Sequence, residues 1–457
     1  MLRREPANRM TAHPAPPATA PREFFGHPPA LSYLFATEMW ERFSYYGMRA
    51  LLTLYMIKYL LLPAQAGGVA GLAGFKSVLE AVFGPLALQP LASQIYGFYT
   101  GLVYLTPIFG GLLADRLLGQ RRTVILGASL MAAGHFLMAF ERWFLLALLV
   151  LILGNGCFKP NISTQVGSLY APGDHRRDRA FSIFYVGINL GAFLAPLVCG
   201  TLGETYGWHY GFAAAGIGMT LGLAIYLVAT PTLPRDAFVR RDTSHKMDRA
   251  GWRGIGALLV LFIPVSLFWA TYEQQGNTIA LWADGFTDRH VFGAEIPVTW
   301  FQAFNPLMIF AFTPFIVALW RRQGKREPST VVKLAIGLLL NAASWLLMAA
   351  AAQLTGGGQA SWLWLFAFFV VITVGELYLS PTSLSLVTKV APAGVLSMMM
   401  GVWLSTSFVG GFLAGYLGTF WSAMSKPGFF LMLAVISAAA GLFVALASRP
   451  LRGVLRD

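Results

Sequence analysis

The fold is decided by a stretch near the amino terminus that reads Glu38-Met39-Trp40-Glu41-Arg42-Phe43-Ser44-Tyr45-Tyr46-Gly47-Met48-Arg49. In a helix, 100° per residue places its four charged side chains, Tyr45 and Tyr46 within an arc of about 140°. A charge at the centre of a bilayer costs about 2.5–3.5 kcal/mol on insertion scales. Two glutamates and two arginines in three turns must therefore face a bundle interior or a water-filled cavity, which indicates a transport pathway.

The composition is typical of a membrane protein with many spans. Of 457 residues, 56% are hydrophobic and 12% are charged, and the mean hydropathy is +0.61. These values lie outside the range of soluble globular proteins. Twelve apolar stretches are each long enough to cross a hydrocarbon core about 30 Å thick. They lie near 31–60, 91–113, 123–141, 143–164, 181–200, 211–230, 254–273, 300–320, 331–353, 361–388, 395–420 and 428–447.

The polar segment 231–253 divides these stretches six and six, which predicts an all-α membrane protein of two six-helix bundles. We expect an amino-terminal bundle over 29–230, a cytoplasmic linker over 231–253 and a carboxy-terminal bundle over 254–448. Residues 1–28 are rich in Pro and Ala and contain no apolar core of the kind found in signal peptides. They predict a disordered cytoplasmic tail, and 449–457 predicts a second cytoplasmic tail.

Lysine and arginine are distributed unevenly between the two ends of the predicted spans. With both termini in the cytoplasm, 25 of the 33 basic residues lie on the cytoplasmic side, 4 on the opposite side and 4 within spans. Such an excess is typical of cytoplasmic loops. The net charge of +13 is therefore explained by topology and not by nucleic-acid binding. We expect a multi-pass protein of a bacterial inner membrane, with no role assigned to the outer loops 62–90 and 274–299.

The segment after the second span reads Gly111-Leu-Leu-Ala-Asp115-Arg116-Leu-Leu-Gly119-Gln-Arg121-Arg122. Glycine allows two helices to approach closely, and the charged groups can tie an inner loop. A tight basic loop would suit many membrane proteins, but this combination resembles the loop signature of the major facilitator superfamily. The resemblance implies a fold and says nothing about a substrate.

Later spans carry ionisable groups at membrane depths where a charge exposed to lipid is unfavourable. Lys159 precedes Pro160 within the fourth span, and proline frees a backbone carbonyl that must lie beside a cavity or other protein. The alternative, a lysine that extends to the interface, is disfavoured because Lys159 is several residues from either end. Glu376 lies in the middle of the tenth span, where an idle carboxylate is unfavourable. Glu273, at the end of the seventh, is also compatible with an interfacial position.

Amide and indole side chains in the same spans have two interpretations each. Asn189 and Asn305 can join helices or contact a ligand. Trp269 and Trp403 can pack in the core, anchor the membrane interface or form the wall of a pocket. The residue pattern leaves these alternatives open.

These motifs together closely resemble those of the proton-dependent oligopeptide transporter (POT) family. The resemblance rests on the first-span motif, Tyr104-Leu-Thr-Pro-Ile-Phe-Gly-Gly, Phe184-Tyr185 with Asn189, and Gly375-Glu376 with Ser380-Pro381. It extends from about residue 30 to 445. It implies a twelve-helix major facilitator fold. It also implies a transporter that imports di- and tripeptides by alternating access, with protons as the coupling ion and no other cofactor.

The resemblance also implies roles for individual residues. By position, Arg49 and Lys159 correspond to the family's cations for the peptide carboxylate, and Glu376 corresponds to its partner of the peptide ammonium. The outer proton site falls on Glu273, and further coupling charges fall on Glu38, Glu41 and Arg42. Contacts to the peptide backbone and the walls of the pocket fall on Tyr46, Tyr104, Asn189, Asn305, Trp269, Trp403 and Ser380.

The sequence departs from the family pattern in two places. Many bacterial members carry an extra helix pair between the halves, for which 231–253 is too short. Animal members place a histidine beside a tyrosine in the second span, whereas here Tyr96 is followed by Gly97, so protonation must rest on carboxylates. We therefore expect the plain twelve-helix form without the inter-bundle pair, acting as a monomer among membrane lipids.

A zwitterionic peptide needs one positive and one negative anchor, and the two halves supply them. A pair between Glu273 and Arg49 is expected to hold the outer side closed until Glu273 is protonated. Lys159 with Glu376, Glu38 or Glu41 is expected to form an alternative inner latch. A proton antiporter that exports drugs is the alternative of the same architecture. A peptide-sensing receptor or an intramembrane enzyme would need a signalling domain or a catalytic set, and we find neither in the sequence.

Overall fold

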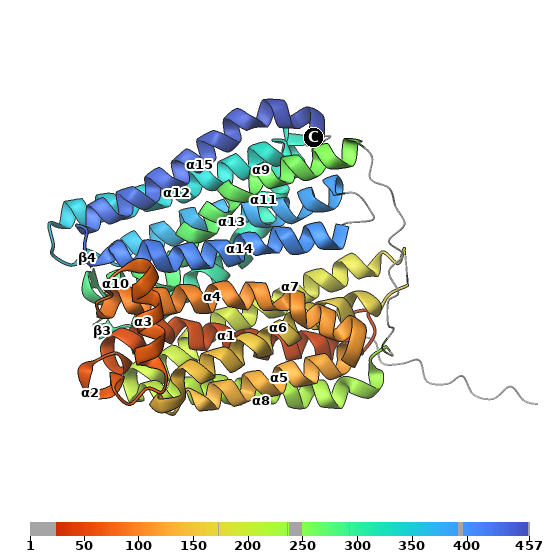
Figure 1. The fold of residues 1–457 in the computed structure, drawn as a ribbon. Helices are drawn as coiled ribbons and strands as arrows, with labels where there is room; N and C mark the ends of the chain where they lie inside the picture. Colours follow the sequence, from red (N-terminus) through yellow and green to blue (C-terminus); the bar gives the residue numbers. More distant parts are fainter. Residues whose placement is uncertain are drawn as a thin grey trace, which may run out of the picture.

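The computed structural model describes residues 24–171, 173–234, 236, 249–291, 293–391 and 396–455. Much of the predicted tail 1–28 and of the linker 231–253, and the end of the tail 449–457, lie outside the described residues. Most of the described chain is helical, and its long helices run side by side in two stacked groups (Figure 1).

Each group of helices has its own apolar core. The buried apolar side chains form one cluster within 30–233 and a second within 255–444, which Leu54 also joins. The amino-terminal half contains α1 (Ala30–Tyr55), α4 (Leu88–Leu113), α5 (Gln120–Leu137), α6 (Phe144–Ser168), α7 (Arg176–Ala195) and α8 (Trp208–Ala229). The carboxy-terminal half contains α9 (Arg249–Tyr272), α11 (Phe304–Gln323), α12 (Thr330–Thr355), α13 (Leu363–Val390), α14 (Leu396–Gly418) and α15 (Lys426–Leu455).

Ten helices of the described chain are long and apolar enough to cross a membrane. The helices α1 and α5 are not among them. In α1 the reason is visible in the sequence, because four charged side chains between Glu38 and Arg49 lower the hydropathy of every window that contains them. All four are buried within the protein, so α1 is a central helix whose charges face other helices and not lipid.

The two segments that were expected to be long outer loops contain helices. The first holds α2 (Pro63–Ala66) and α3 (Leu72–Phe83), and α4 begins earlier than expected. In the second, the 3₁₀ turn η7 (Glu273–Gly276) and α10 (Thr278–Gly285) extend α9. Short strands follow, with β1 (Thr287–Asp288) parallel to β4 (Ala360–Ser361) and β2 (His290–Val291) antiparallel to β3 (Ala294–Glu295).

The two halves meet closely at the end of the bundle where α10 lies, which we call the α10 end. The opposite end, where α1 begins and α8 ends, is called the linker end (Figure 1). Towards the α10 end α4 crosses α14 at glycines, and a methyl group at Gly97 would lie 2.9 Å from the carbonyl oxygen of Gly411. Glycine is required there because any side chain would separate the two backbones.

Candidate functional site

A cavity of about 360 Å³ lies between the two halves. Its wall contains every residue for which a binding or coupling role was expected, except Glu41. Four side chains of α1, namely Glu38, Arg42, Tyr46 and Arg49, line it at intervals of three or four residues, as one face of a helix requires. The other expected residues in the wall are Tyr104, Lys159, Asn189, Trp269, Glu273, Asn305, Glu376, Ser380 and Trp403.

The charged side chains of α1 do not all face the cavity, because one of them lies in the contact between α1 and α6. Glu41 is fully buried and lies outside the cavity wall, where it pairs with Arg42 and accepts a hydrogen bond from Asn155 Nδ2 of α6 at 3.2 Å. Glu38 Oε1 also contacts Arg42 Nε, at 3.2 Å. Arg42 is therefore shared by two carboxylates, of which only Glu38 reaches the cavity.

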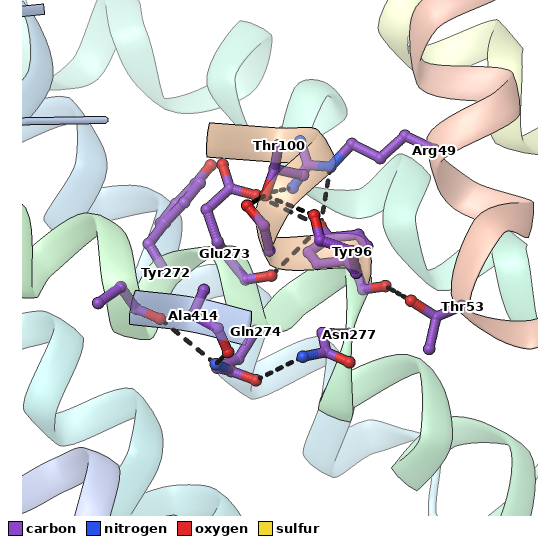
Figure 2. Close-up of polar contacts among 12 residues, drawn as sticks. Arg49, Thr53, Tyr96, Thr100, Tyr272, Glu273, Gln274, Asn277 and Ala414 are labelled. Atoms are coloured by element: carbon purple, nitrogen blue, oxygen red, sulfur yellow. Dashed lines mark hydrogen bonds and ion pairs between the residues drawn. The ribbon is translucent and has the colours of Figure 1, made fainter. Parts of the chain in front are cut away.

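An ion pair joins the halves at the α10 end of the cavity. Arg49 Nη2 of α1 donates to Glu273 Oε2 at 2.6 Å, and Arg49 Nε donates to the hydroxyl of Tyr96 at 3.0 Å. Tyr96 in turn lies 3.3 Å from both Glu273 Oε2 and the Glu273 carbonyl oxygen. Figure 2 shows the three side chains directed toward one another from α1, α4 and the start of η7. Both charged groups are more than nine-tenths buried, so this pair is largely screened from solvent.

A second layer of contacts lies farther toward the α10 end. The Thr53 hydroxyl donates to the carbonyl oxygen of Gly276 at 2.8 Å, which joins α1 to η7. The Gln274 amide donates to the carbonyl oxygen of Ala414 at 2.8 Å (Figure 2). Asn277 accepts from the Ser93 hydroxyl at 2.9 Å. Segment 274–278 is therefore a buried part of the closed α10 end and not an exposed loop.

Lys159 enters the cavity from α6, directly before the internal Pro160. Its ammonium lies 4.5 Å from the centre of the Tyr104 ring, a cation–π distance. Among the described residues no carboxylate lies within 4 Å of the Lys159 ammonium. The inner latch that we expected from Lys159 to Glu376, Glu38 or Glu41 is thus not formed in this conformation.

Glu376 enters the cavity from α13, in the opposite half. Its Oε2 accepts hydrogen bonds from the Tyr272 hydroxyl at 2.7 Å and from Asn305 Nδ2 at 2.8 Å. In the described part of the chain neither a cation within 4 Å nor a hydrogen bond to Oε1 is found for this carboxylate. The donors around Glu376 are therefore neutral.

The remaining expected residues lie around these charges. Asn189 donates to the carbonyl oxygen of Tyr185, one turn earlier in α7, while its side chain also faces the cavity. Trp269, Trp403 and Ser380 line the carboxy-terminal side. Tyr96 and Tyr272 had no expected role, although the hydroxyl of each contacts a carboxylate of the cavity wall. The signal was their position: Tyr272 adjoins Glu273, and Tyr96 precedes the glycine of the α4–α14 crossing.

The chain is similar to a family model, to curated proteins and to solved structures. The family model PTR2, described as the POT family, matches residues 121–237 and 231–432. A di-/tripeptide transporter of Lactococcus lactis subsp. cremoris is 34% identical over 95% of this chain and 98% of its own. A peptide transporter of Yersinia enterocolitica subsp. palearctica is 36% identical over 87% of this chain and 88% of its own. The crystal structure of a peptide transporter POT in complex with sulfate matches with a TM-score of 0.85 and 31% identity, covering 96% of this chain and 98% of that one.

These similarities confirm the family that the motifs predicted and the expectation of a transporter instead of an enzyme. The apolar helices and the transporter relatives together identify a multi-pass integral membrane protein. In the described residues no three His, Cys, Asp or Glu side chains gather as a metal site requires. The chain belongs to the POT family.

Proposed function

We propose that this protein is a proton-coupled symporter that imports di- and tripeptides by alternating access. The observation that carries the proposal is the pair of charges without ionic partners on opposite sides of one cavity. Lys159 belongs to the amino-terminal half and Glu376 to the carboxy-terminal half, and among the described residues neither has an ion-pair partner. A peptide with free termini supplies a carboxylate for the first and an ammonium for the second.

The physical basis is that each charge is desolvated by the cavity wall. A charge removed from water is strongly unfavourable unless an opposite charge and hydrogen bonds replace the solvent. A bound zwitterion meets this requirement for both residues at once and also bridges the halves. An exported apolar cation would satisfy Glu376 and leave Lys159 unpaired, so the charges favour peptide import over the drug-export alternative.

The rest of the wall suits ligands that share a backbone and differ in side chains. Asn189 and Asn305 can pair with peptide N–H and C=O groups, which all peptides have. Tyr46, Trp269 and Trp403 offer flat apolar surfaces that accept side chains of many shapes. The proposed specificity is therefore strict for the backbone and its termini and broad for the side chains.

Proton coupling in this proposal starts at Glu273. While Glu273 is ionised it holds Arg49 and keeps the α10 end closed through the 2.6 Å ion pair. Protonation removes the negative charge and frees Arg49 for the carboxylate of an arriving peptide. One proton that crosses 100 mV supplies about 2.3 kcal/mol, which supports roughly a fifty-fold gradient of a neutral peptide.

We further propose the membrane arrangement. The helices α1 and α5 cross the membrane with the ten apolar ones, because buried charges in α1 need not face lipid. The protein then has twelve spans in two six-helix bundles and no inter-bundle helix pair. It acts as a monomer in a bacterial inner membrane, with both termini in the cytoplasm, as the excess of basic residues favours. The α10 end then faces outward and is closed in this conformation.

The test is uptake of labelled dialanine and trialanine into liposomes that contain the purified protein. An inside-negative potential with an inward proton gradient should drive accumulation of both peptides. A proton-selective ionophore should abolish the accumulation and leave peptide exchange intact. Accumulation that does not depend on the proton gradient would contradict coupling, and efflux of a cationic dye against its gradient would instead favour the exporter.

A further inference from the structure

A carboxylate outside the cavity forms hydrogen bonds between the two halves at the α10 end. Beyond α7 the chain forms two consecutive π-helical turns, η4 (Pro196–Gly200) and η5 (Leu202–Tyr206), and Glu204 lies in the second. Opposite them in the other half lies the 3₁₀ turn η8 (Val298–Ala303), which leads directly into α11. Single π-turns often mark functional positions in helices.

Glu204 binds the amino terminus of η8 with both carboxylate oxygens. Its Oε2 accepts from the backbone N–H of Val298 at 2.8 Å. Its Oε1 accepts from the backbone N–H of Thr299 at 2.8 Å and from the Thr299 hydroxyl at 2.6 Å. The first N–H groups of a helix have no partner within the helix and carry partial positive charge. An ionised carboxylate matches them in both charge and geometry.

The surrounding packing shows that this contact requires a close approach of the two halves. Val298 and Thr299 are almost completely buried. A methyl group at Gly200 would lie 2.6 Å from Thr299 Cβ, so only glycine permits this spacing. The indole N–H of Trp300 also donates to the Thr201 hydroxyl at 2.8 Å.

We propose that Glu204 is a second latch between the halves, which in its ionised form holds the α10 end closed independently of Arg49 and Glu273. The proposal rests on the alternating-access function above, because opening this end must break the three hydrogen bonds to Val298 and Thr299. A neutral carboxylic acid has no negative charge and one of its oxygens becomes a hydroxyl, a weaker acceptor, so it binds the two backbone N–H groups less strongly. Protonation of Glu204 therefore loosens the latch and favours opening.

Other charged groups line the crevice beside Glu204 and must be separated from it experimentally. They are Lys58, which pairs with Asp284 at 2.5 Å, and Arg289, which pairs with Glu295. His209, at the start of α8, lies 3.5 Å from Glu141 within the amino-terminal half. Asp284 and Glu295 already have cationic partners, whereas Glu204 has only the neutral donors of η8 among the described residues.

The experiment measures the distance between the halves at the α10 end in the full-length protein in lipid nanodiscs. Cys157 and Cys199 are first replaced by alanine, and Val82 of α3 and Leu354 of α12, both highly exposed, are replaced by cysteine. Spin labels are then attached to these two introduced cysteines. Without peptide at neutral pH, Glu204→Gln should raise the ratio of long to short distances by about tenfold or more, as expected for loss of hydrogen bonds to a charged group. Glu204→Asp, which keeps the charge, should partly restore the short distance.

Two further variants distinguish a latch from a local helix cap. Thr299→Val removes only the hydroxyl donor and should shift the ratio in the same direction by about tenfold, because the lost hydrogen bond is to a charged group. Glu80→Gln is the matched control, because Glu80 accepts from the backbone N–H of Leu86 at 2.9 Å within the same half. It should leave the ratio unchanged. An unchanged ratio in both Glu204→Gln and Thr299→Val would refute the latch.

A pH series tests protonation itself. Lowering the pH should open the α10 end of the Glu273→Gln variant, and adding Glu204→Gln should remove that response. A response that persists in the double variant would assign it to another group, such as Asp284 or Glu295, and would overturn the role of Glu204 protonation. These distances are measured without substrate, so a failure of peptide uptake and a failure of the latch are separate results.

Discussion

Replacing Glu376 by glutamine tests the ammonium anchor most directly, because the substitution keeps size and polarity and removes only the charge. The two donors on Oε2, Tyr272 at 2.7 Å and Asn305 at 2.8 Å, can still bind the amide oxygen. Oε1, to which no described residue donates, is the atom available to a peptide ammonium. The variant therefore loses a charge-assisted bond to the ligand with little change in the surrounding hydrogen bonds.

The magnitude follows from that single lost contact. A hydrogen bond to a charged group contributes about 1.5–3 kcal/mol, and about 1.4 kcal/mol corresponds to tenfold in affinity. Affinity for dialanine should therefore fall about ten- to a hundredfold in Glu376→Gln. N-acetylated dialanine has no ammonium to lose, so its weaker binding should change much less. The mutation and the chemical block should thus be strongly non-additive.

The assay is competition by each peptide against uptake of a labelled dipeptide, for the wild type and for Glu376→Gln. Counterflow, which needs no proton gradient, separates binding from coupling. If free and acetylated peptides lose the same factor, Glu376 acts on the opening and closing of the cavity and does not bind the ammonium.

Three further predictions concern the opposite charges and their neighbours. Glu273→Gln should abolish gradient-driven accumulation but spare peptide exchange, and Glu273→Asp should weaken coupling only; full accumulation by the Gln variant would remove this residue as the coupling group. Amidated dialanine should compete much less well than dialanine, because it leaves Lys159 unpaired, and equal competition would contradict the placement of the cation. Tyr96→Phe removes the hydroxyl that accepts from Arg49 and lies 3.3 Å from Glu273, so the α10 end should open about tenfold more readily in distance measurements, and no change would show that the ion pair alone closes this end.

Much of the cavity is predictable from the sequence, and the reason is the membrane. A charge at bilayer depth is strongly unfavourable unless it faces protein or water. Because Lys159 and Glu376 lie in the middle of their spans, a position in the wall of an internal cavity was expected for both. Helical periodicity then relates Glu38, Arg42, Tyr46 and Arg49 to one another, and these four do line the cavity. Family motifs added the roles, which the residue pattern alone left open for Asn305 and Trp269.

Periodicity specifies how side chains are arranged around their own helix axis, but it does not specify which neighbour each side meets. Glu41 shares the charged arc of α1, yet it faces Asn155 of α6 and not the cavity, because α6 packs against that side. The same limit explains why segment 274–278 reads as a polar loop although its residues are buried between the halves.

Contacts between residues far apart in sequence emerge only when the two halves are packed together. Arg49 and Glu273 are 224 residues apart, and Glu204 and Thr299 are 95 apart. Nothing in the local sequence of Glu204 distinguishes it from a solvated glutamate at the end of a span. Two of its three donors are backbone N–H groups, which every residue except proline carries, so no residue type signals these two. The position of η8 against the end of α7 is what converts this carboxylate into a contact between the halves.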